Sequence, residues 1–351
     1  MKVCYFGAYN RKSMRVINNI KALRKAGVEV VECYDRSFPL PVRYHRLFWE
    51  HRRIDYDVMV VGWYGHSVLP LARSIAKGPV VLDAFIGLYE TEVLDRRNYA
   101  RNSLKVRLYY LLDKYHFKFA DICLVDTNHH GDYFHQEFEV PREKLKTLYV
   151  SADEEYYFPR ETHKSHERFC ILFEGGYTPL HGIQHIIAAA KLLEGRKDIQ
   201  FVLVGTGQTY NGIRRLAEGL RLRNVTFLPW MSYERLPGVI AKADVCLGIF
   251  DVGEKASRVI PSKAIDALAM KKPLITADSP AAREMLEDKV NCLLIPAGDP
   301  TALANAILSL KEDKTLANKI AGNGYELFKA QFSLEATGKK LKQILEETLN
   351  R

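Results

Sequence analysis

The sequence contains no long apolar stretch, no close pair of cysteines and no recognisable nucleic-acid-binding motif. In 351 residues no apolar run reaches the roughly 18 residues that a membrane-spanning helix needs. The opening residues, MKVCYFGAY, lead straight into a strand-like run and lack the apolar core and cleavage site of a signal peptide. We therefore expect a cytoplasmic protein. Zinc-finger spacing and RNP-like aromatic motifs are missing as well, so no nucleic-acid partner is predicted.

The cysteines argue against a metal centre. None belongs to a CxxC pair, and each lies in or beside a short apolar run, as expected of small buried side chains in a reduced protein. The six are Cys4, Cys33, Cys123, Cys170, Cys246 and Cys292.

Positive charge is in excess, with a formal net charge of +9 in an otherwise ordinary globular composition of 47% hydrophobic and 26% charged residues. Such an excess suits phosphorylated small molecules or anionic lipid headgroups. The simpler explanation is that dispersed lysines and arginines keep the protein soluble.

Short β-rich runs alternate with helical patterns through the whole chain, which predicts α/β domains with parallel sheets. Strands are expected near residues 2–8, 28–34, 56–64, 78–85 and 121–127, and again near 169–176, 199–207, 224–230, 244–250, 272–278 and 292–297. Helices are expected near residues 14–26, 183–195, 213–223, 234–243, 264–270, 301–312 and 333–349. The two halves therefore repeat one doubly wound architecture, in which ligands bind at the carboxyl ends of the strands.

The domain boundaries follow from a polar, irregular segment at about residues 150–168, which we interpret as a linker. We predict one Rossmann-like domain over residues 1–160 and a second over 161–332. The last segment, 333–351, is predicted to form a helix that crosses back to the first domain.

Several stretches in this order resemble the GT-B glycosyltransferases, specifically the large retaining family 4. They include RVINNIKALRKAGVEV, FEGGYTPLHGIQHIIAAAKLL, VTFLPWMSYERLPGVIAKADVCLGIF and GEKASRVIPSKAIDALAMKKPLI. The resemblance implies two Rossmann-like domains facing each other across a cleft. The N-terminal domain would bind an acceptor, and the C-terminal domain a nucleotide-diphosphate sugar. It also implies metal-independent chemistry with no cofactor; UDP, GDP and ADP donors are not distinguished.

The passage FEGGYTPLHGI resembles the family's first loop of the nucleotide domain. Gly175 and Gly182 fit the pattern, whereas Gly176 stands where the family has Arg and His181 where it has Lys. His181 is then either a weaker donor to phosphate or a helix-entry residue.

A second glycine pair, in VLVGTGQ, follows a strand and precedes a helix. Gly205 and Gly207 would let backbone amides approach a phosphate. A tight turn between strand and helix is the alternative.

The passage GEKASRVIPSKAIDALAMKKPLI places cations at the entrance of a helix. Asp266 takes the place of the family's second glutamate, which implies contacts with ribose hydroxyls, whereas Arg258 stands where the first glutamate would be. We expect a longer loop to bring either Glu254 or Asp251 to the sugar hydroxyls, and Arg258, Ser262 and Lys263 to bind the diphosphate. The alternative is an exposed basic loop in which Ser262 is the N-cap.

The resemblance also implies that Trp230 and Met231 border the nucleobase, although Trp230 as a core residue is an alternative. The run LKVRLYYLLDKYHFKF, residues 104–119, mixes basic and aromatic residues at helical spacing. It predicts either docking at the inner face of a membrane or an ordinary packed helix.

The acceptor domain offers Asp83 and His66 as catalytic candidates, because both follow predicted strands. A carboxylate that orders a loop is the alternative for Asp83. His129, His130 and His135 could together form a metal site. No carboxylate is well spaced to complete the ligands, which argues against such a site. Asp55 and Asp57 spell DxD, but they precede a strand and so lie at the wrong edge for a ligand.

The predicted reaction is sugar transfer to an acceptor hydroxyl on a glycan or a lipid-linked substrate, with retention. A sugar-nucleotide 2-epimerase of the same fold and a non-catalytic sugar-nucleotide-binding protein remain alternatives.

Overall fold

The computed structural model describes residues 1–100, 102–161 and 168–351. Within these residues the chain divides into two compact units. The first contains Met1–Ser151 and Leu334–Arg351, and the second Ala152–Ser333. Part of the predicted linker, residues 162–167, lies outside the described residues.

The first unit is built on a parallel sheet in the order β2-β1-β3-β4-β5-β6. Its strands are β1 (Lys2–Gly7), β2 (Glu29–Tyr34), β3 (Val58–Val61), β4 (Val80–Asp83), β5 (Ile122–Val125) and β6 (Leu145–Thr147). Its helices are α1 (Met14–Lys25), α2 (Leu40–His51), α3 (Leu69–Ile75), α4 (Leu104–Phe119), α5 (Asn128–Phe138) and α12 (Leu334–Leu349). Short turns of helix cover Gly65–Ser67 and Arg142–Lys144, and a π-helix covers Glu90–Asp95.

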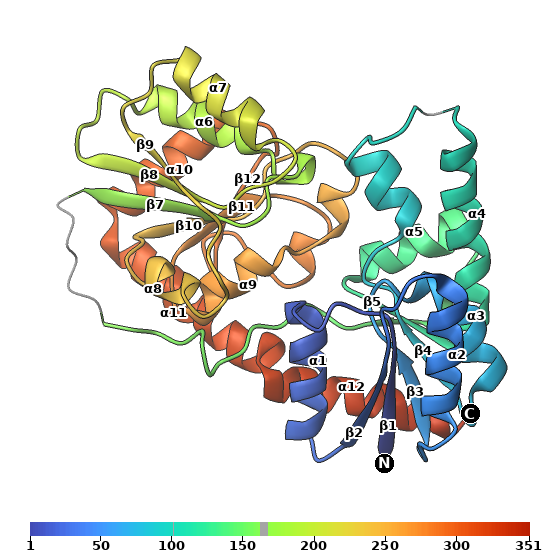
Figure 1. The fold of residues 1–351 in the computed structure, drawn as a ribbon. Helices are drawn as coiled ribbons and strands as arrows, with labels where there is room; N and C mark the ends of the chain where they lie inside the picture. Colours follow the sequence, from blue (N-terminus) through green and yellow to red (C-terminus); the bar gives the residue numbers. More distant parts are fainter. Residues whose placement is uncertain (101, 162–167) are drawn as a thin grey trace. The chain divides into compact units, whose positions relative to one another are not determined.

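Two layers of helices cover this sheet. Figure 1 shows α1 and α12 on one face and α2 and α3 on the other. The core under α1 and α12 includes Ile20, Leu23 and Leu341. The opposite core contains Leu47 of α2, Leu69 of α3 and Phe117 of α4.

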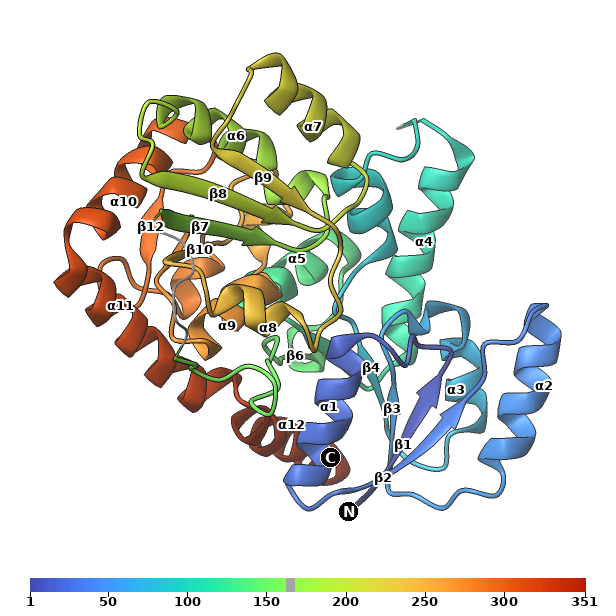
Figure 2. The ribbon, with the colours of Figure 1, turned by 60° about the vertical axis from the view of Figure 1, so that its left-hand side comes forward.

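The second unit has a parallel sheet in the order β12-β11-β10-β7-β8-β9. Its strands are β7 (Phe169–Glu174), β8 (Ile199–Val204), β9 (Val225–Leu228), β10 (Val245–Leu247), β11 (Leu274–Ala277) and β12 (Leu293–Ile295). Its helices are α6 (Ile183–Leu192), α7 (Tyr210–Gly219), α8 (Leu236–Ile240), α9 (Ser262–Ala269), α10 (Pro300–Glu312) and α11 (Lys314–Leu327). Shorter helical segments are Pro179–His181, Ala256–Arg258, Ala282–Glu284 and the π-helix Phe328–Phe332. Figure 2 shows α6 and α7 on one side of this sheet and α8 and α9 on the other.

The doubly wound α/β class predicted from the sequence is confirmed in both units, because every strand pair is parallel and helices connect them. None of the described helices combines the length and the apolar character needed to cross a bilayer.

Candidate functional site

The strand order of the second unit reverses between β7 and β10, which lie side by side although two further strands separate them in sequence. The chain leaves these two strands toward opposite ends of the sheet, and such a switch point is where open α/β sheets bind ligands. In this unit the segments that follow the two strands nevertheless come into contact. A Cβ on Gly182, whose φ is 62°, would lie 2.4 Å from the backbone nitrogen of Asp251. Gly182 is therefore required for the packing of this edge.

The predicted phosphate-binding glycines hold the loops after β7 and β8 together. Gly205 has a φ of 132°, and a Cβ there would lie 1.9 Å from the carbonyl oxygen of Gly175. A Cβ on Gly207 would lie 2.7 Å from the nitrogen of Tyr177. The close approach of the two backbones therefore supports the alternative that Gly205 and Gly207 form a tight turn. At Gly176 a Cβ would meet only a methyl group, 4.0 Å away.

Lys263 is the central cation of the site. It is the second residue of α9, and only 5% of it is exposed. Its Nζ lies 3.0 Å from Nε2 of His181. A Cβ placed on Gly175 would lie 3.4 Å from the same Nζ. The helix entrance therefore delivers an ammonium group to the glycine loop that follows β7.

His181 holds Lys263 in this position. Its Nδ1 is hydrogen-bonded to the carbonyl oxygen of Gly176, which can only accept, so Nδ1 carries the proton. Nε2 is then the acceptor for Lys263. Burial, together with the nearby charge of Lys263, holds the pKa of His181 well below its ordinary value, consistent with a neutral ring. Both ring nitrogens are occupied, so the prediction that His181 itself donates to phosphate does not fit the structure.

Two buried carboxyl groups lie near this lysine, Glu174 at the end of β7 and Asp266 one turn along α9. Burial raises the pKa of both groups, and burial lowers the pKa of Lys263 against the opposing effect of the two carboxylates. One oxygen of Glu174 has no hydrogen-bond partner within the described structure. Neither carboxylate is within 4.0 Å of Lys263, since the ion pairs found among the described residues do not include this lysine. Lys263 is thus a desolvated cation without a contacting counter-ion.

Arg258 and Glu254, predicted to have separate roles, contact each other. The guanidinium group donates to the Glu254 carboxylate, whose side chain is 77% exposed, against 16% for Arg258. Ser262 is the first residue of α9, and Pro261 occupies the N-cap position. The alternative in which Ser262 caps the helix is therefore wrong.

The predicted nucleobase residues follow β9. Trp230 is 62% exposed, which rules out the alternative that it belongs to the core. Met231 beside it is half-buried. A flat aromatic surface at a strand end can stack on a base.

In the first unit, Asp83 forms a buried ion pair. Nε of Arg15 lies 2.8 Å from Oδ1 of Asp83, and Asn19 donates to Oδ2 at 3.3 Å. The carboxylate, 2% exposed, is thus fully engaged with α1. This geometry fits the structural alternative for Asp83 better than a catalytic role.

His66 is also buried. Its Nε2 lies 3.3 Å from Oδ1 of Asp113, and the same carboxylate accepts from the backbone nitrogens of Leu88 and Tyr89 at 3.0 and 2.8 Å. His66 therefore packs against a carboxylate that orders the turn before the π-helix. Its predicted catalytic role would need movement of this network.

A buried triad that the sequence analysis did not foresee lies at the end of β5. Nδ1 of His130 is 2.6 Å from Asp126, and its Nε2 is 3.1 Å from Glu90 of the π-helix. His135 bonds instead to the carbonyl oxygen of Val140. The described residues contain no group of three or more His, Cys, Asp or Glu side chains arranged to hold a metal. The three histidines therefore do not converge.

Asp55 and Asp57 precede β3 and are exposed, and Asp57 accepts from the backbone nitrogen of Lys2 at 2.7 Å. This is the solvated strand entrance that the sequence predicts. Glu174, by contrast, was missed. The available signal was a single charged residue ending the apolar run FCILF, directly before two glycines.

Residues 168–313 match the family model described as Glycosyl transferases group 1. The chain is 26% identical over 247 residues to an alpha-D-kanosaminyltransferase of Streptomyces kanamyceticus, covering 65% of this chain and 61% of that protein. It is 21% identical over 344 residues to an uncharacterised glycosyltransferase of Methanocaldococcus jannaschii, covering 95% of this chain and 86% of that protein.

Among solved structures, HepE of Anabaena in complex with UDP matches with a TM-score of 0.74 and 18% identity. The match covers 99% of this chain and 100% of HepE. At this identity the likeness concerns the fold.

Proposed function

We propose that this chain is a glycosyl transferase of group 1 with the GT-B fold, which transfers a sugar from a nucleotide diphosphate to an acceptor hydroxyl with retention at the anomeric carbon. The second unit would bind the donor, and the first the acceptor. The names of the relatives favour transfer over the 2-epimerase alternative.

The observation that carries this proposal is the position of Lys263. A buried ammonium group without a contacting carboxylate lies under a glycine loop at the switch point of the sheet. Such a group is costly to bury alone and gains most from an anion that replaces its lost water. A diphosphate supplies that charge, and Arg258 would join once it exchanges Glu254 for the ligand.

The chemistry follows from where charge develops. As the bond between the sugar and the diphosphate breaks, negative charge grows on the leaving group and the anomeric carbon becomes oxocarbenium-like. A cation already fixed beside the leaving oxygen stabilises this state by several kcal/mol, because it needs no reorganisation. We assign that role to Lys263, with His181 fixing its direction and Asp266 binding the ribose.

UDP is the first nucleotide to test, because HepE was crystallised with it. Calorimetry should detect UDP binding to the full chain, and Lys263→Met should weaken it at least about tenfold, since one charge-assisted contact is lost. Lys319→Met provides the control: this lysine is exposed on α11, away from the site. Equal affinity of Lys263→Met and the parent would refute the clamp. Failure of UDP, GDP and ADP alike to bind would refute the donor proposal.

Turnover separates the remaining alternatives. A transferase incubated with a UDP-sugar and a matching acceptor releases UDP and extends the acceptor. A 2-epimerase would convert the donor without an acceptor, and a binding protein would do neither. Product analysis by mass spectrometry distinguishes the three outcomes.

We further infer that the acceptor is lipid-linked and that the first unit docks on an anionic membrane surface. Along α4, exposed apolar side chains recur every three or four residues: Leu104 (86%), Leu108 (52%), Leu111 (37%), Tyr115 (55%) and Phe119 (40%). They form one stripe of the helix, because this spacing matches 3.6 residues per turn. Lys105, Arg107, Lys114 and Lys118 lie on the same helix. An apolar stripe accompanied by cations supports interfacial binding.

Vesicle flotation tests this inference. The protein should float with vesicles containing phosphatidylglycerol, and Leu108→Asp should abolish most of the bound fraction, because a carboxylate would enter the interface. Leu192→Asp is the matched control, since Leu192 is 58% exposed but belongs to α6 of the second unit. Flotation that survives Leu108→Asp, or is absent from the parent protein, would contradict membrane docking.

A further inference from the structure

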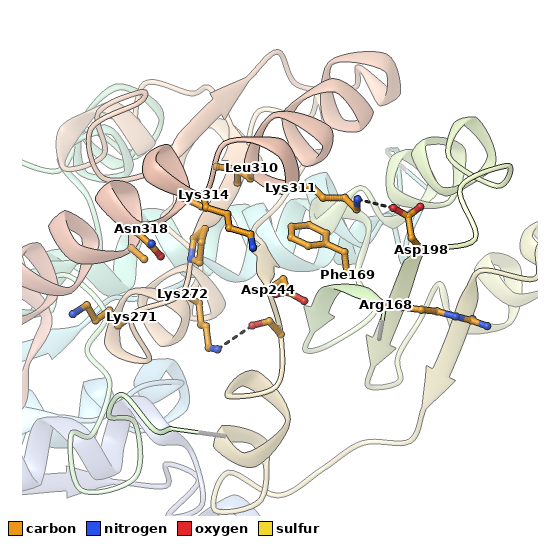
Figure 3. Close-up of a pocket in the computed structure, with 14 residues that line it drawn as sticks. Arg168, Phe169, Asp198, Asp244, Lys271, Lys272, Leu310, Lys311, Lys314 and Asn318 are labelled. Atoms are coloured by element: carbon orange, nitrogen blue, oxygen red, sulfur yellow. Dashed lines mark hydrogen bonds and ion pairs between the residues drawn. The ribbon is translucent and has the colours of Figure 1, made fainter. Parts of the chain in front are cut away.

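A hollow of about 640 Å³ lies at the amino edge of the second unit's sheet, opposite the edge that carries Lys263. Its lining includes Phe169 at the start of β7 and the segment before β11. Figure 3 shows Lys311 and Lys314 on one side of this hollow and Lys272 on the other. The two ends of β7 are separated by roughly 17 Å at the rise of a parallel strand. The hollow is therefore distinct from the donor site.

A second hollow of about 500 Å³ lies along the same edge and shares Arg168 with the first. Together the two are lined by nine cationic side chains: Arg168, Arg196, Lys197, Arg221, Arg223, Lys271, Lys272, Lys311 and Lys314. The carboxylates that line them are Glu194, Asp198 and Asp244. This edge is strongly electropositive.

Only part of this charge is neutralised by neighbours. Asp198 contacts Lys311 at 2.6 Å and Arg196 at 3.4 Å, and Lys272 donates to the carbonyl oxygens of Ala241 and Ala243. Within residues 1–100, 102–161 and 168–351, six lining cations take part in no ion pair: Arg168, Lys197, Arg221, Arg223, Lys271 and Lys314.

Helix dipoles explain some of these cations. Helices of a doubly wound sheet end at its amino edge, and Lys or Arg beyond a helix C-terminus interacts favourably with the last carbonyls. Lys271 and Arg221 follow α9 and α7 in this way. Lys314 follows Asp313, the C-cap of α10, and also begins α11, so the dipoles of the two helices act on it in opposite senses. Arg168 precedes a strand and is not explained by a helix dipole.

The backbone conformation of two lining cations provides a way to test their role. Lys271 has a φ of 52° and Arg221 a φ of 54°, the left-handed conformation in which glycine is unstrained and a long side chain is not. One of these residues lines each hollow. Both residues directly follow a helix C-cap, where a left-handed residue commonly ends the helix, so their backbone fixes where each cation leaves the helix end.

We propose that this amino edge is a binding site for a compact oligophosphate, with its phosphate groups distributed between the two hollows around Arg168. Several phosphates in a row match unpaired cations along one edge better than a single phosphate does. The exposed, cation-lined hollows also suit a soluble ligand rather than a lipid surface. This site does not depend on the proposed sugar transfer.

Sodium tripolyphosphate is the probe, used with the full chain at physiological salt. Calorimetry should detect binding, and the double variant Lys271→Gly, Arg221→Gly should weaken it at least about tenfold. The same variant should raise the melting temperature of the unliganded protein, because glycine relieves both left-handed residues. A purely structural role for the two cations predicts unchanged tripolyphosphate affinity.

Lys289→Gly is the matched control. Lys289 has a φ of 59° but lines neither hollow. This variant should gain stability and keep the affinity for tripolyphosphate. The variant Lys263→Met should also keep the affinity for tripolyphosphate, because Lys263 lies in the donor site. Loss of binding in Lys263→Met would place the probe in the donor site and overturn the proposal. So would binding to phosphatidylglycerol vesicles without binding to tripolyphosphate, or equal affinity of the double variant and the parent.

Discussion

At the scale of single residues, His130 shows how the first unit keeps a charge in its interior. The imidazole is fully buried between Glu90 and Asp126, which are themselves 0% and 2% exposed. Burial alone would lower the pKa of His130, but the two carboxylates outweigh it and raise the pKa to about 9. The ring therefore stays protonated at neutral pH and ties the π-helix to the end of β5.

This arrangement predicts a stability that depends on pH. The pKa of His130 is higher in the folded state than the ordinary value of 6.5, so its contribution is complete below about pH 6.5 and is lost as pH rises through about 9. The expected loss is on the order of 3 kcal/mol. Urea unfolding of the parent and His130→Gln at both ends of this range measures it.

The stability difference between these two proteins should shrink toward high pH. His45→Gln is the control, since His45 is exposed on α2 of the same unit. A difference that does not change with pH would show that His130 contributes by packing alone.

The site was partly predictable from the sequence for reasons visible in its residues. Lys263 was singled out as a cation at a helix entrance, where anions bind, and Asp266 because it stands where the resembling family has its second glutamate. The hydrogen-bond partners of His181 were not predicted. An imidazole ring can bond to a ligand or to the protein, and only the packed structure decides between the two. The pairing of Arg258 with Glu254 depends in the same way on side-chain rotamers.

At the scale of elements, the contact between α1 and α12 depends on a glycine. A Cβ on Gly338 of α12 would lie 2.2 Å from the carbonyl oxygen of Ala22 in α1. Gly338→Ala should therefore lower the free energy of unfolding by about 1–3 kcal/mol, because the helices must separate. Urea unfolding monitored by circular dichroism measures the change.

Gly322 offers a control of opposite sign. It lies within α11, and a Cβ there meets nothing within 4 Å. Gly322→Ala should stabilise by up to about 1 kcal/mol through helix propensity. If Gly338→Ala stabilised by the same amount, the close approach of α1 and α12 would be disproved.

Elements with a strong apolar pattern were predicted, and those without one were missed. Runs such as FCILF and VVLD are buried strands, and their composition gives them away. By contrast, β6 has three half-buried residues, and α2 starts between two prolines, Pro39 and Pro41. Such elements form because the sheet or neighbouring helices provide a surface on which they pack. This packing cannot be predicted from a short stretch of sequence.

At the scale of the whole molecule, the structure shows where part of the positive charge behind the net charge of +9 is concentrated. The sequence alone allowed dispersed cations that serve solubility. Nine lysines and arginines line the amino edge of the second sheet, and other lysines and arginines lie on α4 with its apolar stripe. The composition set the amount of charge, and the topology concentrated it.

The first unit is also interrupted in sequence, since its last helix, α12, follows the entire second unit. On the ribosome, residues 152–333 are therefore synthesised before the first unit has all of its parts. Leu341, Ile344 and Leu345, which pack in the core under α1, leave the exit tunnel after the whole second unit. The second unit can thus finish folding while the first still exposes the apolar surface beside α1, which makes the nascent first unit a natural client of a chaperone until α12 emerges.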